Sequence, residues 1–167
     1  HDVEKLRSGQ WIFLNGIIYT ARDAAHKRLI ELIEQGKELP FNLKGQAIYY
    51  VGPTPARPGA VIGAAGPTTS YRMDPYTPKL YELGLKATIG KGARAESVIK
   101  ALKKYKGIYF AAVGGAAALI SKCIKACKVI AYPELGAEAI HELMVENFPV
   151  IVVNDIHGGD LYKEGIM

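Results

Sequence analysis

KATIGKGARAESVIKALKKYKGIYFAAV, residues 86–113, holds a strand, a helix and a second strand in succession. The apolar runs at 86–89 and 108–113 are typical of buried strands, and apolar residues recur at helical intervals over 94–105. A strand joined by a helix to another strand is the repeating unit of a parallel sheet. This stretch therefore predicts an α/β fold with a largely parallel sheet.

The same alternation extends outward from this stretch in both directions. The pattern predicts further strands at 45–51, 60–64, 128–132 and 150–154, and further helices at 22–35, 75–83, 115–126 and 136–147. Residues 10–20 are β-branched and aromatic with Asn-Gly at their centre, which predicts a hairpin. Because the hairpin precedes the regular part, we expect a smaller, partly antiparallel second sheet. A Pro- and Gly-rich irregular loop follows the strand at 45–51.

The composition is that of one globular domain. The chain has 167 residues, of which 49% are hydrophobic and 22% charged, so it can build a sizeable core and is not disordered. The net charge of +5 is spread along the chain and is too dilute to indicate nucleic acid. No apolar run is long enough for a membrane span, and the first residues lack a signal-peptide profile. We expect a single domain over 1–167 in the cytoplasm, without a membrane.

The segment GAAGPTTSYRMD, residues 63–74, lies between a predicted strand and a predicted helix. Its backbone N–H groups, three adjacent hydroxyls and Arg72 could converge on a small anion, although the hydroxyls could instead only cap the helix. Arg22 begins the first helix, and Lys91 ends a strand at the edge where α/β sheets bind ligands. Each cation alone is ordinarily a solvated charge, but together the three suit a substrate with two carboxylates.

Two other features carry weaker signals. The two glycines at 114 and 115 follow a predicted strand and resemble a phosphate-binding turn, but they lack a Walker ending, so close packing of helix on strand is the favoured interpretation. Cys123 and Cys127 lie four apart on one face of the helix predicted at 115–126. There they are expected to act as small hydrophobes, since two thiolates complete neither a zinc nor an iron–sulfur site.

The histidines outside the first helix have no assigned role. His157 lies two residues after Asp155, so the two could form an acid–base pair, but no nucleophile accompanies them. A structural role is the favoured interpretation for this pair. His141 is not assigned.

Five segments along the chain form a specific combination: TARDAAHKR at 20–28, GPTTSYRMD at 66–74, GKG at 90–92, AVGGAA at 112–117 and FPVIVVND at 148–155. The combination resembles the β subunit, or C-terminal domain, of class I iron–sulfur fumarases and L-tartrate dehydratases. It spans nearly the whole chain in the order of that family.

The resemblance implies a swivelling β/β/α domain and a hydro-lyase, a carbon–oxygen lyase that interconverts fumarate and (S)-malate or dehydrates tartrate. In this family three cysteines of the other subunit or domain hold a four-iron, four-sulfur cluster, whose fourth iron binds the substrate and polarises its hydroxyl. The resemblance therefore implies a cysteine-rich α subunit as partner, no cluster on this chain alone, and no activity without the partner. A homodimer or a hetero-oligomer is expected.

The resemblance also assigns the site. The substrate contacts of the family fall on Arg22, Thr68, Arg72 and Lys91. The three cations would bind the two carboxylates of the substrate, and Thr68 matches the base at the carbon that loses a proton. Because a neutral hydroxyl is a poor base, Thr68 would need activation by groups from the partner chain.

Supporting roles fall on three more residues: Thr69 would support the loop, and Asp23 and His26 would orient the segment that carries Arg22. The chain departs from the family at Ser70-Tyr71, where small residues are common. Tyr71 could narrow the pocket, so the preference between fumarate and tartrate stays open. A non-catalytic swivelling module that binds anions is the alternative, and the joint presence of the substrate contacts favours the enzyme.

Overall fold

The structure is a computed structural model and describes residues 3–112 and 117–164. Helices and strands alternate through most of it. In chain order the elements are η1 (Val3–Lys5), β1 (Trp11–Thr20), α1 (Asp23–Glu34), β2 (Ala47–Tyr49), η2 (Ser70–Met73), α2 (Thr77–Glu82), β3 (Ala87–Gly90), α3 (Glu96–Tyr105), β4 (Ile108–Ala112), α4 (Ala117–Lys122), β5 (Ile124–Ala131), η3 (Pro133–Glu138) and β6 (Ile140–Asn154).

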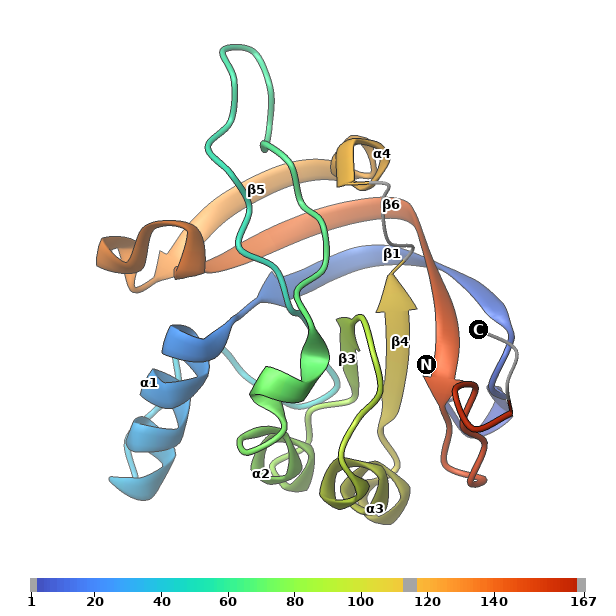
Figure 1. Cartoon of the computed structure of the whole chain (residues 1–167). Coiled ribbons are helices and arrows are strands. Elements are labelled where there is room, and N and C mark those ends of the chain that lie inside the picture. Colours follow the sequence, from blue (N-terminus) through green and yellow to red (C-terminus); the bar gives the residue numbers. More distant parts are fainter. Residues whose placement is uncertain (1–2, 113–116, 165–167) are drawn as a thin grey trace.

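The strands form one mixed sheet in the order β1-β2-β3-β4-β6-β5. The pairs from β1 to β4 are parallel, and β6 runs antiparallel to β4, β5 and β1. Because β6 pairs with both β4 and β1, the sheet closes on itself, and β5 is added outside β6. Figure 1 shows β1, β5 and β6 arching over the top of β3 and β4, with α1, α2 and α3 at the bottom. The α/β class is confirmed, whereas the antiparallel strands continue the parallel sheet and do not form a second one.

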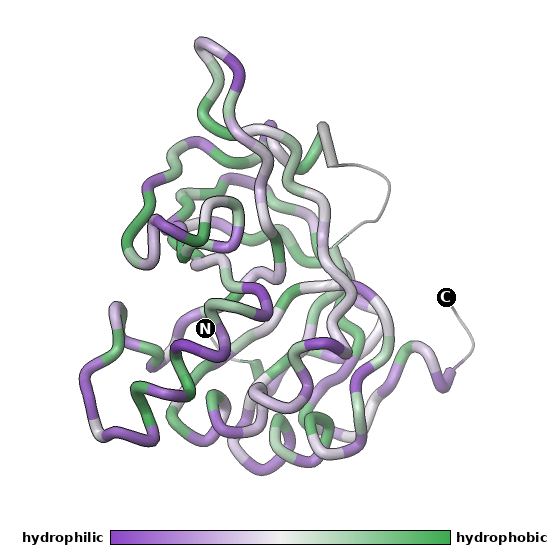
Figure 2. Tube along the Cα trace, turned by 60° about the vertical axis from the view of Figure 1, so that its left-hand side comes forward, coloured by the Kyte–Doolittle hydropathy of each residue, from purple (hydrophilic) through white to green (hydrophobic). Residues whose placement is uncertain are grey.

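Apart from the short η2, the helices and strands nearest to the candidate site are those that the sequence predicts. The helices expected at 22–35, 75–83 and 94–105 correspond to α1, α2 and α3, and β2, β3 and β4 lie within or next to their expected ranges. One buried cluster lies under these helices, and a second fills the inside of the closed sheet. Hydrophilic and hydrophobic residues alternate along the helices at the bottom of Figure 2, as amphipathic helices require. No helix in the described part of the chain has the length and apolar character needed to cross a membrane.

The predicted hairpin at 10–20 is wrong. Residues 11–20 are the single strand β1, which pairs with β6 from Trp11 opposite Ile151 to Tyr19 opposite Glu142. The register shifts between Leu14 and Gly16, and Gly16 has a positive φ of 115°. The Asn-Gly pair thus lies at a bulge whose extra residue is in β6, because Asn15 stands opposite both Glu146 and Asn147, and the N–H of Asn147 donates to Oδ1 of Asn15 at 2.9 Å.

The helix predicted at 115–126 is confirmed only in part, and one predicted helix and one predicted strand are wrong. In its described residues, 117–126, the first range contains the short α4 and the start of β5, so Cys123 and Cys127 do not share a helical face. The range 136–147 contains part of η3 and the start of β6. Residues 60–64 form no strand. The glycine turn predicted at 113–115 lies outside the described residues.

An arm, defined as residues 53–64, extends from the body of the protein between β2 and η2. Figure 1 shows it rising above β1, β5 and β6, on the side opposite to α1, α2 and α3. The N–H of Thr54 donates to the carbonyl of Ala64 at 3.0 Å, and the N–H of Gly63 donates to the carbonyl of Thr54 at 3.1 Å. These hydrogen bonds join the two sides of the arm at Thr54, Gly63 and Ala64, which we call its neck. Residues 54–61 are all exposed. This is the irregular loop that the sequence predicts, longer than expected because the strand at 60–64 is absent.

Candidate functional site

The predicted substrate contacts gather at the carboxyl ends of the parallel strands. Lys91 directly follows β3, and Thr69 pairs with it in an isolated parallel bridge. The N–H of Ser70 donates to the carbonyl of Lys91 at 2.9 Å, and the N–H of Thr68 donates to the carbonyl of Tyr50 at 2.7 Å. The segment of Thr68 therefore lies between the ends of β2 and β3, at the edge where α/β folds bind ligands.

Arg72 is oriented by an ion pair with Asp23. Its Nε and Nη2 both donate to Oδ2 of Asp23, at 3.1 and 2.8 Å, which joins η2 to the first turn of α1. Both side chains are partly exposed, at 42% and 36%. The ion pair therefore orients the Arg72 side chain more than it stabilises the fold. The other carboxylate oxygen of Asp23 is buried and has no hydrogen-bond partner among the described residues.

Arg22 lies against the chain that leaves β2. A Cβ atom at Gly52 would come within 2.9 Å of Nη1 and 3.0 Å of Cδ of Arg22, so a larger residue there would displace the Arg22 side chain from this position. The Nε of Arg22 is buried without a hydrogen-bond partner in the described part of the chain. Since buried donors are nearly always paired, this N–H fits an acceptor from a bound anion or a water molecule.

His26 contacts the backbone of Arg22 from inside the core. Its ring lies edge-on to Tyr50 and stacked on Tyr76, with ring centres 5.5 and 5.7 Å away. Nδ1 is 2.8 Å from the carbonyl of Arg22, so the ring donates there. Burial lowers the pKa of His26 to about 4, so the imidazole is neutral at neutral pH.

A buried arginine that the sequence analysis did not single out joins the loops of the site. Arg94 donates from Nε to Oδ1 of Asp74 at 2.7 Å, from Nη1 to Thr88 at 3.0 Å, and from Nη2 to Tyr50 and Thr77 at 3.0 and 2.9 Å. Because every guanidinium nitrogen has an acceptor, the charge is accommodated inside the protein. Asp74 follows η2 directly, so this pair fixes the far end of the segment that carries Arg72.

A second buried connection ties the same two loops together. The hydroxyl of Tyr109 donates to the carbonyl of Gly92 and accepts from Ser70, both at 2.7 Å. Burial raises the pKa of Tyr109, so its hydroxyl keeps its proton. A Cβ at Gly90 would collide with Oγ of Ser70. The loops that carry Arg72 and Lys91 are therefore fixed relative to each other. In the sequence, the one sign that these loops belong to a common site is that each carries a charged residue next to the end of a strand or helix.

The Asp155–His157 pair has a structural role in this fold. Burial alone would raise the pKa of Asp155, but backbone N–H groups of Gly159, Ser8 and His157 donate to its carboxylate and lower it. The imidazole of His157 turns away and contacts the carbonyl of Glu4 at 2.7 Å through Nε2. The two side chains therefore do not form an acid–base pair.

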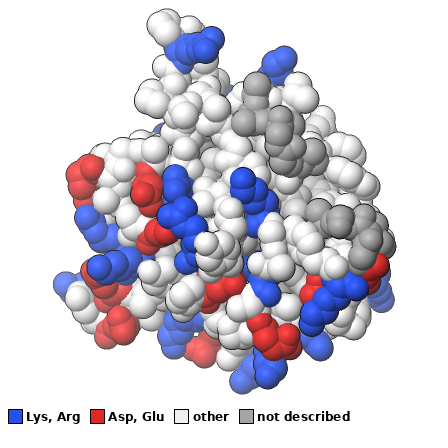
Figure 3. Space-filling model, viewed as in Figure 1, with Lys and Arg blue, Asp and Glu red and all other residues white. Residues whose placement is uncertain are grey.

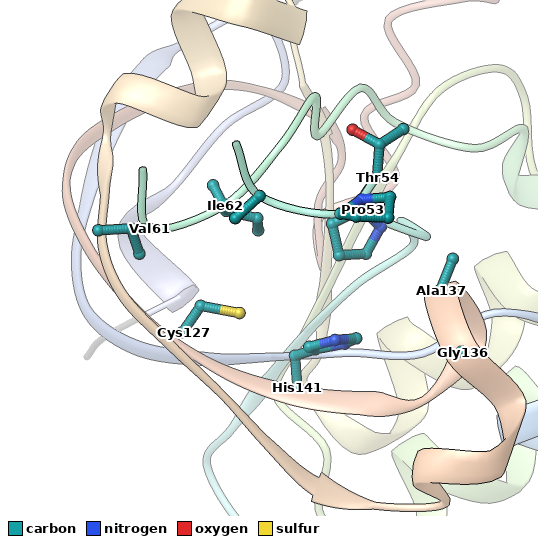
Figure 4. A pocket seen from close by; sticks show the side chains of 10 residues that line it. Pro53, Thr54, Val61, Ile62, Cys127, Gly136, Ala137 and His141 are labelled. Atoms are coloured by element: carbon teal, nitrogen blue, oxygen red, sulfur yellow. The ribbon is translucent and has the colours of Figure 1, made fainter. Parts of the chain in front are cut away.

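A pocket of about 250 Å³ lies beneath the arm. Its lining residues are Pro53, Thr54, Pro55, Ala56, Val61 and Ile62 from the arm, Cys127 from β5, Gly136 and Ala137 from η3, and His141 from β6. Figure 4 shows the sulfur of Cys127 and the ring of His141 below the arm residues. His141 Nδ1 is 3.0 Å from the carbonyl of Ala139, and burial lowers the pKa of this ring.

The side chains of this chain do not fit an iron–sulfur cluster. Cys123 and Cys127 are its two cysteines, and one lines the pocket while the other lies near the carbonyls of Leu119 and Asn147. No three metal-binding side chains gather anywhere in residues 3–112 and 117–164.

The surface around the candidate site carries one large aromatic side chain, because Tyr71 is 63% exposed. Figure 3 shows several basic side chains near the middle of the face below the arm, with acidic ones beside them.

Comparison with known proteins gives consistent matches over nearly the whole chain. The family model described as Fumarase C-terminus matches residues 1–165. The chain is 40% identical over 159 residues to fumarate hydratase 2 of Leishmania major, and 42% identical over 153 residues to the anaerobic class I fumarate hydratase of Escherichia coli K12. These matches cover 93% and 90% of this chain, but only 28% of each relative.

A third relative is matched over most of its own length. A protein of Methanocaldococcus jannaschii named as an L(+)-tartrate dehydratase subunit beta is 40% identical over 169 residues. That match covers 98% of this chain and 87% of the relative. The chain thus spans little more than a quarter of the two fumarate hydratases and most of the subunit.

Proposed function

Because the chain belongs to the Fumarase C-terminus family, we propose that it is the β subunit, or the corresponding part, of an iron–sulfur hydro-lyase that interconverts fumarate and (S)-malate. The observation that supports this proposal is that the segments carrying Arg22, Thr68, Arg72 and Lys91 meet at the carboxyl ends of the parallel strands. An L-tartrate dehydratase β subunit is the second candidate, since the match to such a subunit covers most of both chains. Each substrate has four carbons and two carboxylates.

The cations would bind and orient the substrate. Arg72 and Lys91, held by the buried connections between their loops, would take one carboxylate, and Arg22 would take the other through its guanidinium. Fixed donors of this kind need no rearrangement when the substrate binds. The pairing of Arg72 with Asp23 supports a preset orientation of its guanidinium.

Thr68 would carry the proton transfer. In this proposal its Oγ accepts the proton from the substrate carbon, while a base of the partner chain takes the hydroxyl proton of Thr68. Thr69 supports the loop through its bridge to Lys91, and His26 orients the Arg22 backbone as a neutral ring.

The partner is a cysteine-rich α subunit that binds the four-iron, four-sulfur cluster, because the cysteines of this chain do not suit one. We further propose that residues 1–167 are a single domain of the swivelling β/β/α type. The domain acts in the cytoplasm within a homodimer or a hetero-oligomer, without contact to nucleic acid or membrane.

The test is anaerobic assembly with the cysteine-rich chain, followed by assays of fumarate, (S)-malate and L-tartrate. Turnover of fumarate and malate supports the main proposal, and turnover of tartrate alone supports the second candidate. Dicarboxylate binding without turnover of any of the three, in a complex with an intact cluster, would indicate the non-catalytic module instead.

A further inference from the structure

The arm begins and ends at the candidate site. At its start, Gly52 lies against the guanidinium of Arg22, and just past its end the N–H of Thr68 donates to the carbonyl of Tyr50. In Figure 1 the arm rises on the side toward which β3 and β4 point with their carboxyl ends. Any polypeptide that completes the site from that edge must therefore pass beside the arm.

The neck of the arm is built to hold its shape. Besides the two backbone hydrogen bonds between its sides, Oγ1 of Thr54 accepts from the N–H of Ala64 at 2.7 Å. A Cβ atom at Gly63 would collide with Thr54 and with the carbonyl of Pro55, so the two sides pack as closely as a glycine allows. A projecting segment fixed in this way loses little conformational entropy when a partner binds it.

The pocket at the base of the arm has the size and lining for one apolar side chain. Its volume of about 250 Å³ lies below the range of roughly 300–1,000 Å³ typical of small-molecule sites. Val61, 47% exposed, lines it from the arm, and Ala137 and Cys127 line it from η3 and β5. Pockets that receive one large apolar side chain are typical of the centre of protein interfaces.

We propose that the arm and the pocket beneath it form the docking site for the cluster-bearing polypeptide, which inserts one apolar side chain into the pocket. The inference rests on the proposed function, because that function requires a second polypeptide at the carboxyl edge of the sheet. The exposed Arg57 near the tip adds a cation for an acidic residue of the partner. A Cβ atom at Gly52 would approach both Arg22 and the carbonyl of Ala137, which lines the pocket, so the pocket lies next to the segment that holds Arg22.

The test compares the affinity of four versions of this chain for the cysteine-rich partner by anaerobic biolayer interferometry. Val61→Asp places a charge in the pocket and is expected to raise the Kd at least tenfold. Replacement of residues 56–61 by Gly-Ser-Gly, which keeps the neck, is expected to raise it at least a hundredfold. Leu83→Asp is the matched control, because Leu83 is also partly exposed but follows α2 at the other end of the molecule; its Kd is expected to stay within twofold of the wild-type value.

Thermal unfolding of each variant checks that the fold is intact, which is expected because all of the changed side chains are exposed. Wild-type affinity in both arm variants would overturn the docking site while leaving the proposed function in place. Failure of the wild-type chain to bind the partner would instead contradict the subunit role itself.

Discussion

Arg72 donates two hydrogen bonds to one oxygen of Asp23, an arrangement that a lysine cannot reproduce. Arg72→Lys in the assembled enzyme is therefore expected to raise KM for the dicarboxylate about tenfold and to lower kcat as well. Arg28→Lys is the matched control, because Arg28 has similar exposure and pairs with Glu134. Steady-state kinetics checks both variants, and unchanged constants for Arg72→Lys would remove this residue from the site.

Thr68 gives a different kinetic signature, since its proposed role is proton transfer. Thr68→Val keeps the shape and removes the hydroxyl, so kcat is expected to fall about a hundredfold or more while KM changes little. Thr68→Ser restores the hydroxyl and is expected to recover most of the rate. Normal turnover in Thr68→Val would exclude the base assignment.

His26 makes stability depend on pH. Burial holds its folded pKa at about 4, below the ordinary 6.5, so between these values the unfolded chain binds a proton that the native protein does not. The contribution of the neutral His26 ring to the free energy of unfolding is complete above pH 6.5 and is lost as the pH falls toward 4. Between pH 7 and pH 5 the free energy of unfolding is expected to fall by about 2 kcal/mol for this reason. Urea unfolding at both pH values measures this loss. His26→Phe is expected to show a loss smaller by that amount, and equal losses in the two proteins would contradict the assignment.

The sequence predicted the three cations of the site and also Asp23 and His26 as their supports, although it linked Asp23 to Arg22 and not to Arg72. It did not single out Arg94 or its pairing with Asp74. Arg22, Arg72 and Lys91 stand next to strand or helix ends, a local property that pattern and resemblance both detect. Arg94 and Asp74 also lie next to element ends, but the ion pair between them forms only because the chain after β3 lies beside the end of η2. Burial of a charge by distant partners leaves no local signal in a single sequence.

At the scale of elements, the ion pair of Arg94 and Asp74 connects the segment just before α3 to the end of η2. Arg94→Met leaves the carboxylate of Asp74 nearly buried without its cation and is expected to cost about 3–5 kcal/mol of unfolding free energy. Lys79→Met, which breaks the exposed pair with Glu82 on α2, is expected to cost at most about 0.5 kcal/mol.

Denaturant unfolding compares the two variants. Equal losses would show that the buried pair contributes no more than the exposed one. If Arg94→Met does not fold, Asp74→Asn gives the comparison, because it keeps an acceptor for the guanidinium and is expected to lose less.

Elements were predicted well where local pattern and tertiary environment agree, as in α1, α3 and β4. They were predicted poorly in β5 and β6. Residues 136–147 contain the helix-favouring Ala, Glu, Leu and Met, yet from Ile140 onward they form a strand paired with both β1 and β5. Pairing on two sides outweighs the small intrinsic preference of such residues for helix.

For the whole molecule, the proposed division, in which the partner binds the cluster and this chain supplies substrate contacts, predicts that the isolated chain is colourless. After anaerobic treatment with iron and sulfide, the purified chain is expected to show no stable cluster absorbance, because its two cysteines cannot supply three ligands. The same treatment of the assembled complex is the control. A stable chromophore on the isolated chain would contradict the division.

The pairing of β1 with β6 has a consequence for biosynthesis. Trp11 lies opposite Ile151, so most of β1 can pair with β6 only after all the elements from α1 to η3 have been synthesised. Until β6 has been made, this part of β1 exposes hydrogen-bonding groups and apolar side chains. Closure of the sheet is therefore a late step of folding that depends on contacts distant in sequence, and the newly made chain needs protection from aggregation until that step is complete.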